Sequence, residues 1–286
     1  MQTIILTVVT LTALGAILAA ALYMVAQRFR TEEDPRIDEV AALLPGANCG
    51  GCGFAGCRAL AEAVVKSETM DNLYCPVGGS EVMQQVAACV GRTVEAREPM
   101  IAVVRCAGAC SLRPPTSLYD GAASCRIEAA LYKGETDCLY GCSGHGDCER
   151  ACLFGALRID AATGLPVVDE EKCTACGACV KACPKRIIEL RKKGPKGCRV
   201  FVSCVNKDKG NVARKACKAA CIACAKCSKA CAFGAIAIEE NIAYIDFTVC
   251  RLCRKCAAEC PTGAIRVNGE WRMENGLAPS PLNFNP

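Results

Sequence analysis

The segment that decides the fold of this chain is Cys173-Thr-Ala-Cys176-Gly-Ala-Cys179-Val-Lys-Ala-Cys183-Pro184. Its spacing, C-x2-C-x2-C-x3-C-P, is that of bacterial iron–sulfur ligands, whose thiolates bind [4Fe–4S] clusters. The spacing recurs in Cys250-x2-Cys253-x2-Cys256-x3-Cys260-Pro261. It occurs a third time in Cys221-x2-Cys224-x2-Cys227-x3-Cys231, where Ala232 replaces the proline. Three such runs in one chain predict a protein that carries electrons.

The second half of the chain contains a repeat. Adding 79 to the residue number moves five cysteines onto five others: Cys125 to Cys204, Cys138 to Cys217, Cys142 to Cys221, Cys148 to Cys227 and Cys152 to Cys231. Adding 77 moves the motif that starts at Cys173 onto the motif that starts at Cys250. A match of this many cysteines at nearly one offset predicts two tandem units of the two-cluster ferredoxin type.

The ferredoxin pattern also predicts how the cysteines are shared. In two-cluster ferredoxins the fourth cysteine of each motif ligates the other cluster. Applied here, this rule predicts three regular quartets: Cys152 with Cys173, Cys176 and Cys179; Cys260 with Cys221, Cys224 and Cys227; and Cys231 with Cys250, Cys253 and Cys256.

A fourth cluster is irregular. Its motif is Cys138-x3-Cys142-x5-Cys148-x3-Cys152, and the repeat places His145 where the other unit has Cys224. Two ligand sets remain open. Either Cys138 completes a quartet with Cys142, Cys148 and Cys183, or His145 ligates iron as histidine does in Rieske centres. We favour Cys138, because a thiolate is the usual ligand of a [4Fe–4S] cluster.

A different cysteine block lies nearer the N-terminus. Asn48-Cys49-Gly-Gly-Cys52-Gly-Phe-Ala-Gly-Cys57 is followed by Cys75-Pro76, with the spacing C-x2-C-x4-C-x17-C. These four thiolates predict a fifth [4Fe–4S] cluster, between short helices expected at residues 37–44 and 59–65. Gly51-x-Gly53-x-x-Gly56 matches the dinucleotide fingerprint, but no strand is expected before it. We therefore expect no NAD or flavin site.

Seven cysteines remain outside these quartets: Cys89, Cys106, Cys110, Cys125, Cys198, Cys204 and Cys217. A sixth cluster held by Cys89, Cys106, Cys110 and Cys125 is one interpretation, and simple burial as small apolar side chains is the other. A disulfide scaffold is disfavoured although 27 of 286 residues are cysteine, because the spacings are those of metal ligands. Zinc is disfavoured by the three consecutive ferredoxin-type runs.

The N-terminal segment predicts a membrane anchor. Residues Thr3 to Ala26 carry no charge, and about 20 apolar residues cross a hydrocarbon core. A cleaved signal peptide is the alternative, but no basic region precedes Thr3. Arg28 and Arg30 follow the apolar segment, so the positive-inside rule predicts that the rest of the chain faces the cytoplasm. Thiolates that hold iron also require a reducing compartment.

The charge distribution suggests a docking face. Residues 181–218 contain 13 Lys/Arg but only Glu189 and Asp208 as acids. Such a stretch would steer an acidic soluble ferredoxin, unless it is simply a solvated loop surface. Nucleic acid is not an expected partner, because no aromatic residues are interleaved and no nucleic-acid module is present. No catalytic acid, base or nucleophile is expected.

The order of these parts resembles a known family. A single N-terminal span, the block from Asn48 to Cys57, the segment from Tyr140 to Cys148 and the ferredoxin repeats are similar to the B subunits of the Rnf complex, in a long form with two ferredoxin units. The resemblance implies an electron-relay subunit of a membrane-bound ferredoxin:NAD oxidoreductase coupled to Na+ or H+ transport. Soluble ferredoxin would be its donor, and other subunits would carry flavin, NAD and the transported ion.

Two alternatives stay open beside this resemblance: a ferredoxin-like subunit of another membrane redox enzyme, and a complex that keeps a redox regulator reduced. In every case the predicted fold class is α+β with five divisions. These are a transmembrane anchor (1–27), a small helical [4Fe–4S] domain (28–98), a first ferredoxin unit with a cysteine-rich lead-in (99–193), a second unit (194–268) and an irregular tail (269–286).

Overall fold

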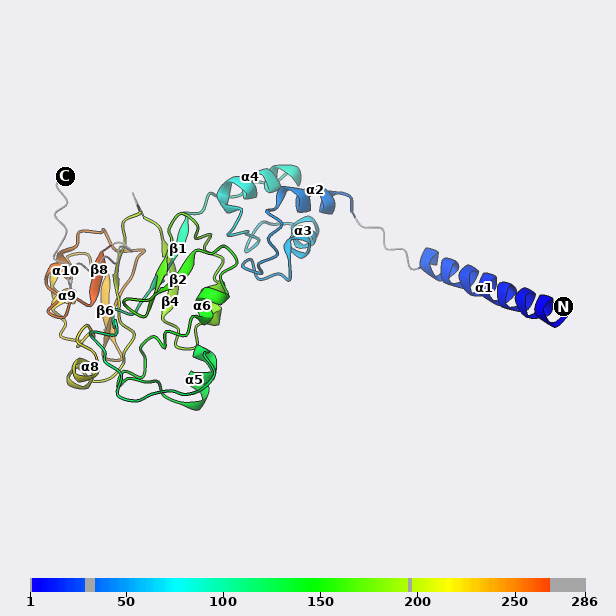
Figure 1. Ribbon diagram of the computed structural model, residues 1–286. Helices are drawn as coiled ribbons and strands as arrows, with labels where there is room; N and C mark the ends of the chain where they lie inside the picture. The colour runs from blue at the N-terminus through cyan, green and yellow to red at the C-terminus, as the bar shows by residue number, and fades with distance from the viewer. Residues whose placement is uncertain (1, 29–33, 195–196, 268–286) are drawn as a thin grey trace.

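The computed structural model describes residues 2–28, 34–194 and 197–267. Along these residues the chain forms a long helix, a small helical domain and a larger body of short helices and hairpins (Figure 1). We keep the predicted boundaries as names for the two halves of the body, the first unit (99–193) and the second unit (194–268). The predicted irregular tail at 269–286 lies outside the described residues.

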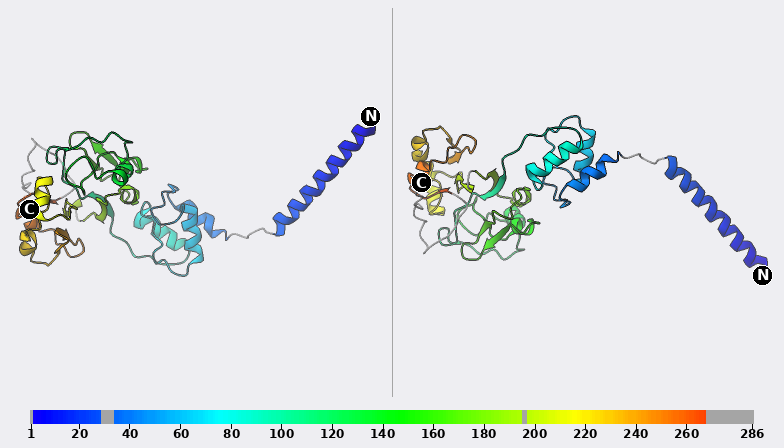
Figure 2. Two further views of the ribbon diagram at one scale, coloured as in Figure 1. Left: turned by 90° about the horizontal axis from the view of Figure 1, so that it is seen from below. Right: turned by 90° about the horizontal axis from the view of Figure 1, so that it is seen from above.

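Helix α1 (Gln2–Arg28) extends away from the rest of the protein, as both views of Figure 2 show. Its most apolar 18-residue window has a mean hydropathy of 2.4, and the stretch Ile4–Arg28 is long and apolar enough to cross a membrane. None of that stretch is buried against the protein, whereas an equally apolar helix of a soluble protein would lie in its core. The helix therefore has the properties expected of the predicted anchor.

The helical domain contains α2 (Arg36–Leu43), α3 (Cys57–Lys66) and α4 (Gly79–Cys89). The first two helices were predicted, and α4 was not. Helix α2 ends where Leu44 turns extended before Pro45, because the residue that precedes a proline disfavours the helical conformation. The three helices enclose a core whose largest fully buried members are Val40, Leu60, Val64, Met83 and Val86.

The first unit is built from two antiparallel strand pairs. Strand β1 (Met100–Val104) pairs with β4 (Ile188–Lys192), and β2 (Leu157–Asp160) pairs with β3 (Leu165–Val168). Strand β1 also packs against β3. The first and last strands of the unit thus meet, which brings the two ends of the unit together. Short helices lie between the strands: α5 (Cys125–Leu131), α6 (Asp147–Arg150) and α7 (Ala178–Ala182).

The second unit has the same topology. Strand β5 (Val200–Val202) pairs with β8 (Ile265–Val267), β6 (Ile236–Glu239) pairs with β7 (Ile242–Ile245), and β5 packs against β7. Its helices are α8 (Gly210–Ala216), α9 (Lys226–Ala230) and α10 (Lys255–Ala258). An apolar N-terminal helix followed by mixed helices and strands in two ferredoxin-type units confirms the predicted fold class.

Three arginines, two of them buried, join the two units. Arg105, just after β1, donates to the carbonyl oxygens of Val202 (3.2 Å) and Cys204 (3.3 Å). Arg191, on β4, is only 1% exposed and lies over the ring of Phe201. Arg199 is also buried and forms an ion pair with Glu170. Arg191 and Arg199 belong to the basic stretch 181–218, so that stretch is partly internal and forms less of a docking face than its composition suggests.

Candidate iron–sulfur sites

The three regular motifs share one backbone conformation. In each, the residue before the second cysteine and the residue after it have positive φ, whereas the cysteine between them has negative φ: Ala175 and Gly177, Ala223 and Ala225, Leu252 and Arg254. Five of these six residues are not glycine, and a left-handed L-residue costs about 1–2 kcal/mol. Such alternation turns consecutive N–H groups toward one side and forms the concavities that bind anions and iron–sulfur clusters. Strained backbone here is consistent with ligand binding.

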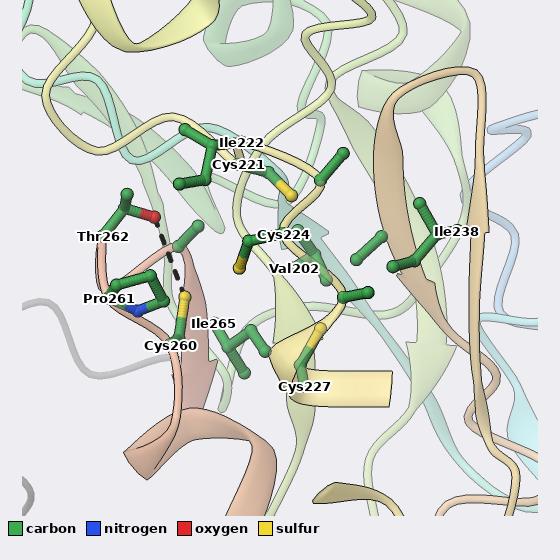
Figure 3. A pocket seen from close by; sticks show the side chains of 14 residues that line it. Val202, Cys221, Ile222, Cys224, Cys227, Ile238, Cys260, Pro261, Thr262 and Ile265 are labelled. Carbon is green, nitrogen blue, oxygen red and sulfur yellow. Dashed lines mark hydrogen bonds between the residues drawn. The ribbon is translucent and has the colours of Figure 1, made fainter. Parts of the chain in front are cut away.

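Two predicted quartets each line one cavity. Cys221, Cys224, Cys227 and Cys260 surround a cavity that we call site D (Figure 3). Its empty space is about 350 Å³; this volume and those given below include the part open to solvent. Site B has the same volume and is lined by Cys152, Cys173, Cys176 and Cys179. In both sites the fourth cysteine comes from the other motif of the unit, as predicted.

The third regular quartet, site E, consists of Cys231, Cys250, Cys253 and Cys256. Cys231, Cys250 and Cys256 pack in one apolar cluster, so the structure brings these three cysteines of the predicted quartet together. Burial is the main cause that raises the pKa of Cys256 to about 12, and the nearby thiols of Cys250, Cys253, Cys227 and Cys231 add to this rise.

Site A is the predicted quartet Cys49, Cys52, Cys57 and Cys75 of the helical domain. The Cys75 thiol lies near those of Cys52 and Cys57 and accepts a hydrogen bond from the N–H of Gly78 at 3.4 Å. Asn48 directly precedes Cys49, and its Oδ1 accepts a hydrogen bond from the backbone N–H of Cys57 at 2.8 Å. This hydrogen bond closes the loop that carries the first three cysteines.

Site C corrects both ligand sets predicted for the irregular cluster. Cys142, Cys148 and Cys183 line a cavity of about 360 Å³, but the fourth cysteine there is Cys125. Cys138 lines a different cavity. His145 does not line the site C cavity, and its Nε2 faces Glu128 Oε2 at 3.4 Å instead. Cys125 thus takes the place for which Cys138 and His145 were considered.

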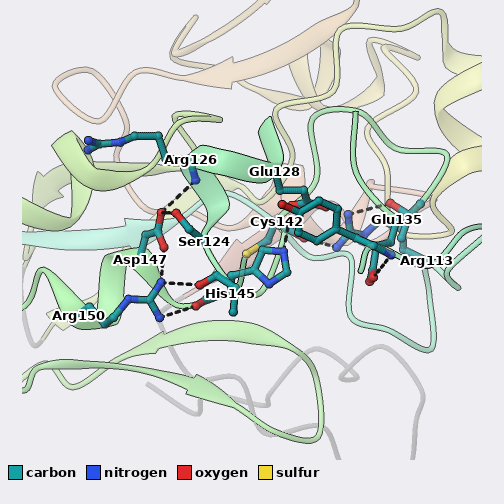
Figure 4. A network of polar contacts seen from close by, with 12 residues as sticks. Arg113, Ser124, Arg126, Glu128, Glu135, Cys142, His145, Asp147 and Arg150 are labelled. Atoms are coloured by element: carbon teal, nitrogen blue, oxygen red, sulfur yellow. Dashed lines mark hydrogen bonds and ion pairs between the residues drawn. The ribbon is translucent and has the colours of Figure 1, made fainter. Parts of the chain in front are cut away.

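The network in Figure 4 explains how Cys125 reaches site C. Asp147 accepts hydrogen bonds from the hydroxyl of Ser124 (2.9 Å) and the N–H of Arg126 (3.0 Å), the two residues that flank Cys125. Arg150 forms an ion pair with Asp147. Asp147 directly precedes Cys148, so one carboxylate ties the start of α5 to the motif. Burial raises the pKa of Asp147, but these hydrogen bonds outweigh burial and the net pKa is lowered.

Sequence reasoning missed Cys125 because no spacing signal marks it. It lies 17 residues before Cys142 and belongs to none of the C-x2-C runs. Its shared offset with Cys204 was noted, but the two cysteines occupy different sites. The replacement of a motif cysteine by His145 was the only sign that a ligand had to come from elsewhere.

Four of the remaining cysteines come together elsewhere. Cys106, Cys138, Cys204 and Cys217 line a fourth cysteine-rich cavity, of about 300 Å³. The structure does not bring the predicted sixth group together. Cys89 ends α4 and donates a hydrogen bond to Glu39 in the helical domain, whereas Cys106 and Cys125 line two separate cavities of the body.

The chemistry of the donor sets fits [4Fe–4S] clusters. Burial is the main cause that raises the pKa of Cys148 and Cys179 to about 12, so these thiols are neutral in the free chain and must lose protons on binding iron. Ser143 in the site C cavity and Thr174 in the site B cavity have buried hydroxyls without a hydrogen-bond partner among the described residues. These hydroxyls can donate hydrogen bonds to a negatively charged group in the cavity. Among the described residues, no group of three or more His, Cys, Asp or Glu side chains is arranged to hold a single metal ion.

The sites lie in contact with one another. A Cβ added to Gly51 in the site A loop would lie 2.7 Å from the carbonyl oxygen of Cys176 in site B. Cys148 of site C and Cys179 of site B belong to one apolar cluster. Cys227 of site D lies near enough to Cys256 of site E to raise its pKa. Sites A, B and C thus form one series, and sites D and E another.

Comparison with known proteins identifies iron–sulfur domains in three segments of the chain. Residues 44–76 match the family "Putative Fe-S cluster", residues 166–189 match "4Fe-4S binding domain", and residues 220–264 match "4Fe-4S dicluster domain". The chain is similar to three curated proteins over most of its length.

The first is the B subunit of the Na(+)-translocating ferredoxin:NAD(+) oxidoreductase complex of Acetobacterium woodii, 44% identical over 83% of this chain and 70% of the relative. The second is the B subunit of the proton-translocating ferredoxin:NAD(+) oxidoreductase complex of Clostridium ljungdahlii, 42% identical over 87% of each chain. The third is the B subunit of the ion-translocating oxidoreductase complex of Methanosarcina acetivorans, 41% identical over 85% of this chain and 90% of the relative.

Proposed function

This chain belongs to the family of B subunits of ion-translocating ferredoxin:NAD(+) oxidoreductase complexes, and we propose that it relays electrons from soluble ferredoxin to the other subunits of such a complex. When bound, a [4Fe–4S] cluster accepts and releases one electron at a time. The contribution of the chain is to hold five such groups, at sites A to E, close to one another. The observation that carries this proposal is that the cysteine quartets lie in contiguous series.

The cysteine loops give these sites their redox character. Their spacer residues are small or left-handed, so backbone N–H groups can approach the sulfur atoms. The fourth cysteines receive further N–H groups, from Ala156 to Cys152 Sγ (3.3 Å) and from Ile187 to Cys183 Sγ (3.5 Å). Hydrogen bonds to sulfur and the degree of solvent exposure both set the reduction potential. The chain can therefore give each site a different potential.

We infer that electrons enter at the second unit. Cys224 of site D and Cys253 of site E are exposed. Exposed basic side chains, Lys226, Arg251 and Lys255, lie next to them in the sequence. Positive charge around an accessible thiolate would attract an acidic ferredoxin and speed its encounter. This surface replaces the stretch 181–218 as the proposed docking face.

We infer that electrons leave through the helical domain. Site A begins about 20 residues after α1, which we take as the single membrane anchor of the chain. Arg28 at the end of α1 favours a cytoplasmic location for everything that follows. Site A would then be the site nearest the bilayer, where membrane-embedded partner subunits are accessible.

The docking proposal is tested by charge reversal. The full chain is purified without oxygen in detergent, and its reduction by reduced ferredoxin is followed by stopped-flow absorbance. Lys226→Glu with Arg251→Glu should lower the second-order rate about tenfold at low salt and flatten its salt dependence. Lys66→Glu, an exposed lysine of the helical domain, is the matched control and should leave the rate unchanged. Equal rates in all three proteins would refute entry at the second unit.

The corrected ligand of site C is tested by iron content. Cys125→Ala should remove about four irons per chain, because one [4Fe–4S] cluster loses a ligand. Cys89→Ala alters a cysteine that lies in none of the cavities and should leave the iron content unchanged. A Cys125→Ala protein with full iron and an unaltered EPR spectrum would contradict the assignment.

A further inference from the structure

We propose that Cys106, Cys138, Cys204 and Cys217 hold a sixth [4Fe–4S] cluster, site F, which bridges the two ferredoxin units. The proposal deepens the relay function and rests on it, because a bridge is needed only if sites A to E carry electrons. It assigns a role to four cysteines that belong to no ferredoxin motif quartet.

The geometry of site F matches that of the other sites. All four cysteines are buried and line one cavity. The empty space between its lining residues, counted with the part open to solvent, is about 300 Å³, against about 350 Å³ at sites B and D and 360 Å³ at site C. Site F therefore offers four thiol donors around a space similar to that at sites B, C and D.

The site also has internal symmetry. Cys106 follows the last residue of β1, Val104, by two positions, and Cys204 follows the last residue of β5, Val202, by two positions. Cys138 and Cys217 are related by the 79-residue offset of the repeat. Each unit therefore contributes two cysteines to one cavity: one placed alike after its first strand, and one related by the repeat. Accidental burial of apolar cysteines does not account for pairs of equivalent residues that converge at the junction of the units.

The wall of the cavity carries donors that lack acceptors. Arg113 Nε and Ser203 Oγ are buried in residues that line it, and neither has a hydrogen-bond partner in the part of the chain that the structure describes. Arg105 lines the cavity as well. The side-chain amide of Asn206 donates a hydrogen bond to Cys138 Sγ at 3.5 Å. Buried donors without partners are costly unless a ligand satisfies them. A group with four thiolate ligands is negatively charged and supplies the missing acceptors.

Site F occupies the gap between the two series of sites. Cys106 packs in one apolar cluster with Cys142 and Cys183 of site C. Cys204 and Cys217 pack in another cluster with Cys221 and Cys227 of site D. The order of sites through the molecule becomes A–B–C–F–D–E. Each transfer moves one electron, one site being oxidised as the next is reduced, and no bond is formed or broken.

The first test counts clusters in the full-length chain, purified without oxygen. Native mass spectrometry and assays of iron and sulfide should find about 24 irons per chain for six sites, against about 20 for five. Cys138→Ala and Cys217→Ala, one from each unit, should each lose about four irons, while Cys89→Ala loses none. About 20 irons in the unmodified chain, zinc at the extra site, or variants with full iron would each overturn site F. The count of the unmodified chain does not depend on whether a variant folds.

The second test separates the bridge from the relay. Reduced ferredoxin is mixed with each protein, and the reaction is frozen at millisecond intervals for EPR. In Cys217→Ala, the sites of the second unit should be reduced while those of the first unit and site A stay oxidised. Reduction of all sites at the unmodified rate would overturn the bridging role and leave the relay intact. A failure of ferredoxin to reduce the unmodified chain at all would instead contradict the proposed function.

Discussion

Replacing Gly51 with alanine should weaken the contact between the helical domain and the first unit. The new Cβ would lie 2.7 Å from the carbonyl oxygen of Cys176, 3.0 Å from its Cα and 3.1 Å from its Cβ. These atoms belong to a backbone loop that also carries site B, so they have little freedom to move away. Gly51 does not have a left-handed φ, so alanine adds no backbone strain of its own. The effect would report the contact alone.

The size of the effect follows from the distances. An ordinary contact needs about 3.4 Å, so the two loops must separate by about 0.7 Å (3.4 − 2.7). Inserting a methyl group into a packed contact costs about 1–3 kcal/mol. A change of this size corresponds to a roughly 5–150-fold shift in the equilibrium between docked and undocked helical domain.

The assay is the magnetic interaction between the reduced clusters of sites A and B, observed as line broadening in EPR. Broadening should decrease in Gly51→Ala, and the delay between the reduction of site B and that of site A after mixing with reduced ferredoxin should be longer than in the unmodified chain. Gly46→Ala is the control: its φ of +67° makes alanine strained, but no atom lies near the added Cβ. Unchanged broadening in Gly51→Ala, or an equal loss in Gly46→Ala, would refute the inference that this contact sets the distance between the sites.

Three further changes test the sites themselves. Asp147→Asn should weaken the charge-assisted hydrogen bonds beside Cys125 by about 1.5–3 kcal/mol. Site C should then lose iron to a chelator faster than in the unmodified chain, and release at the unmodified rate would count against this prediction. Ala223 has a φ of +52°, and branched side chains fit such a left-handed backbone poorly. Ala223→Val should therefore lower the thermal stability of the second unit more than Ala223→Gly does. The reverse order in calorimetry would contradict the strain argument. In the metal-free, reduced chain, burial raises the pKa of Cys179 from about 9 to about 12, so the folded state keeps a proton that the unfolded state loses. That stabilising contribution is complete below pH 9 and disappears as pH rises toward 12, and urea unfolding at pH 8 and pH 11 should show the decrease.

The sequence alone determined the parts of this protein in which ligands are local. The quartets of sites B, D and E could be predicted because three of their cysteines lie in one short loop, and the fourth follows the crossing rule of ferredoxins. Site A could be predicted for the same reason. The membrane helix needed only its length and lack of charge.

Only the tertiary structure decided where isolated cysteines go. Cys125 reaches site C because Asp147 binds the residues on both sides of it, and the sites of Cys106 and Cys138 depend on how the two units dock. Nothing in the local spacing of these cysteines signals a partner, since their neighbours come from strand ends and loops about 17–110 residues away. The burial of Arg191 between the units could not be predicted for the same reason. A charged residue is expected in solvent from the sequence alone, and only the packing of the two units removes this one from water.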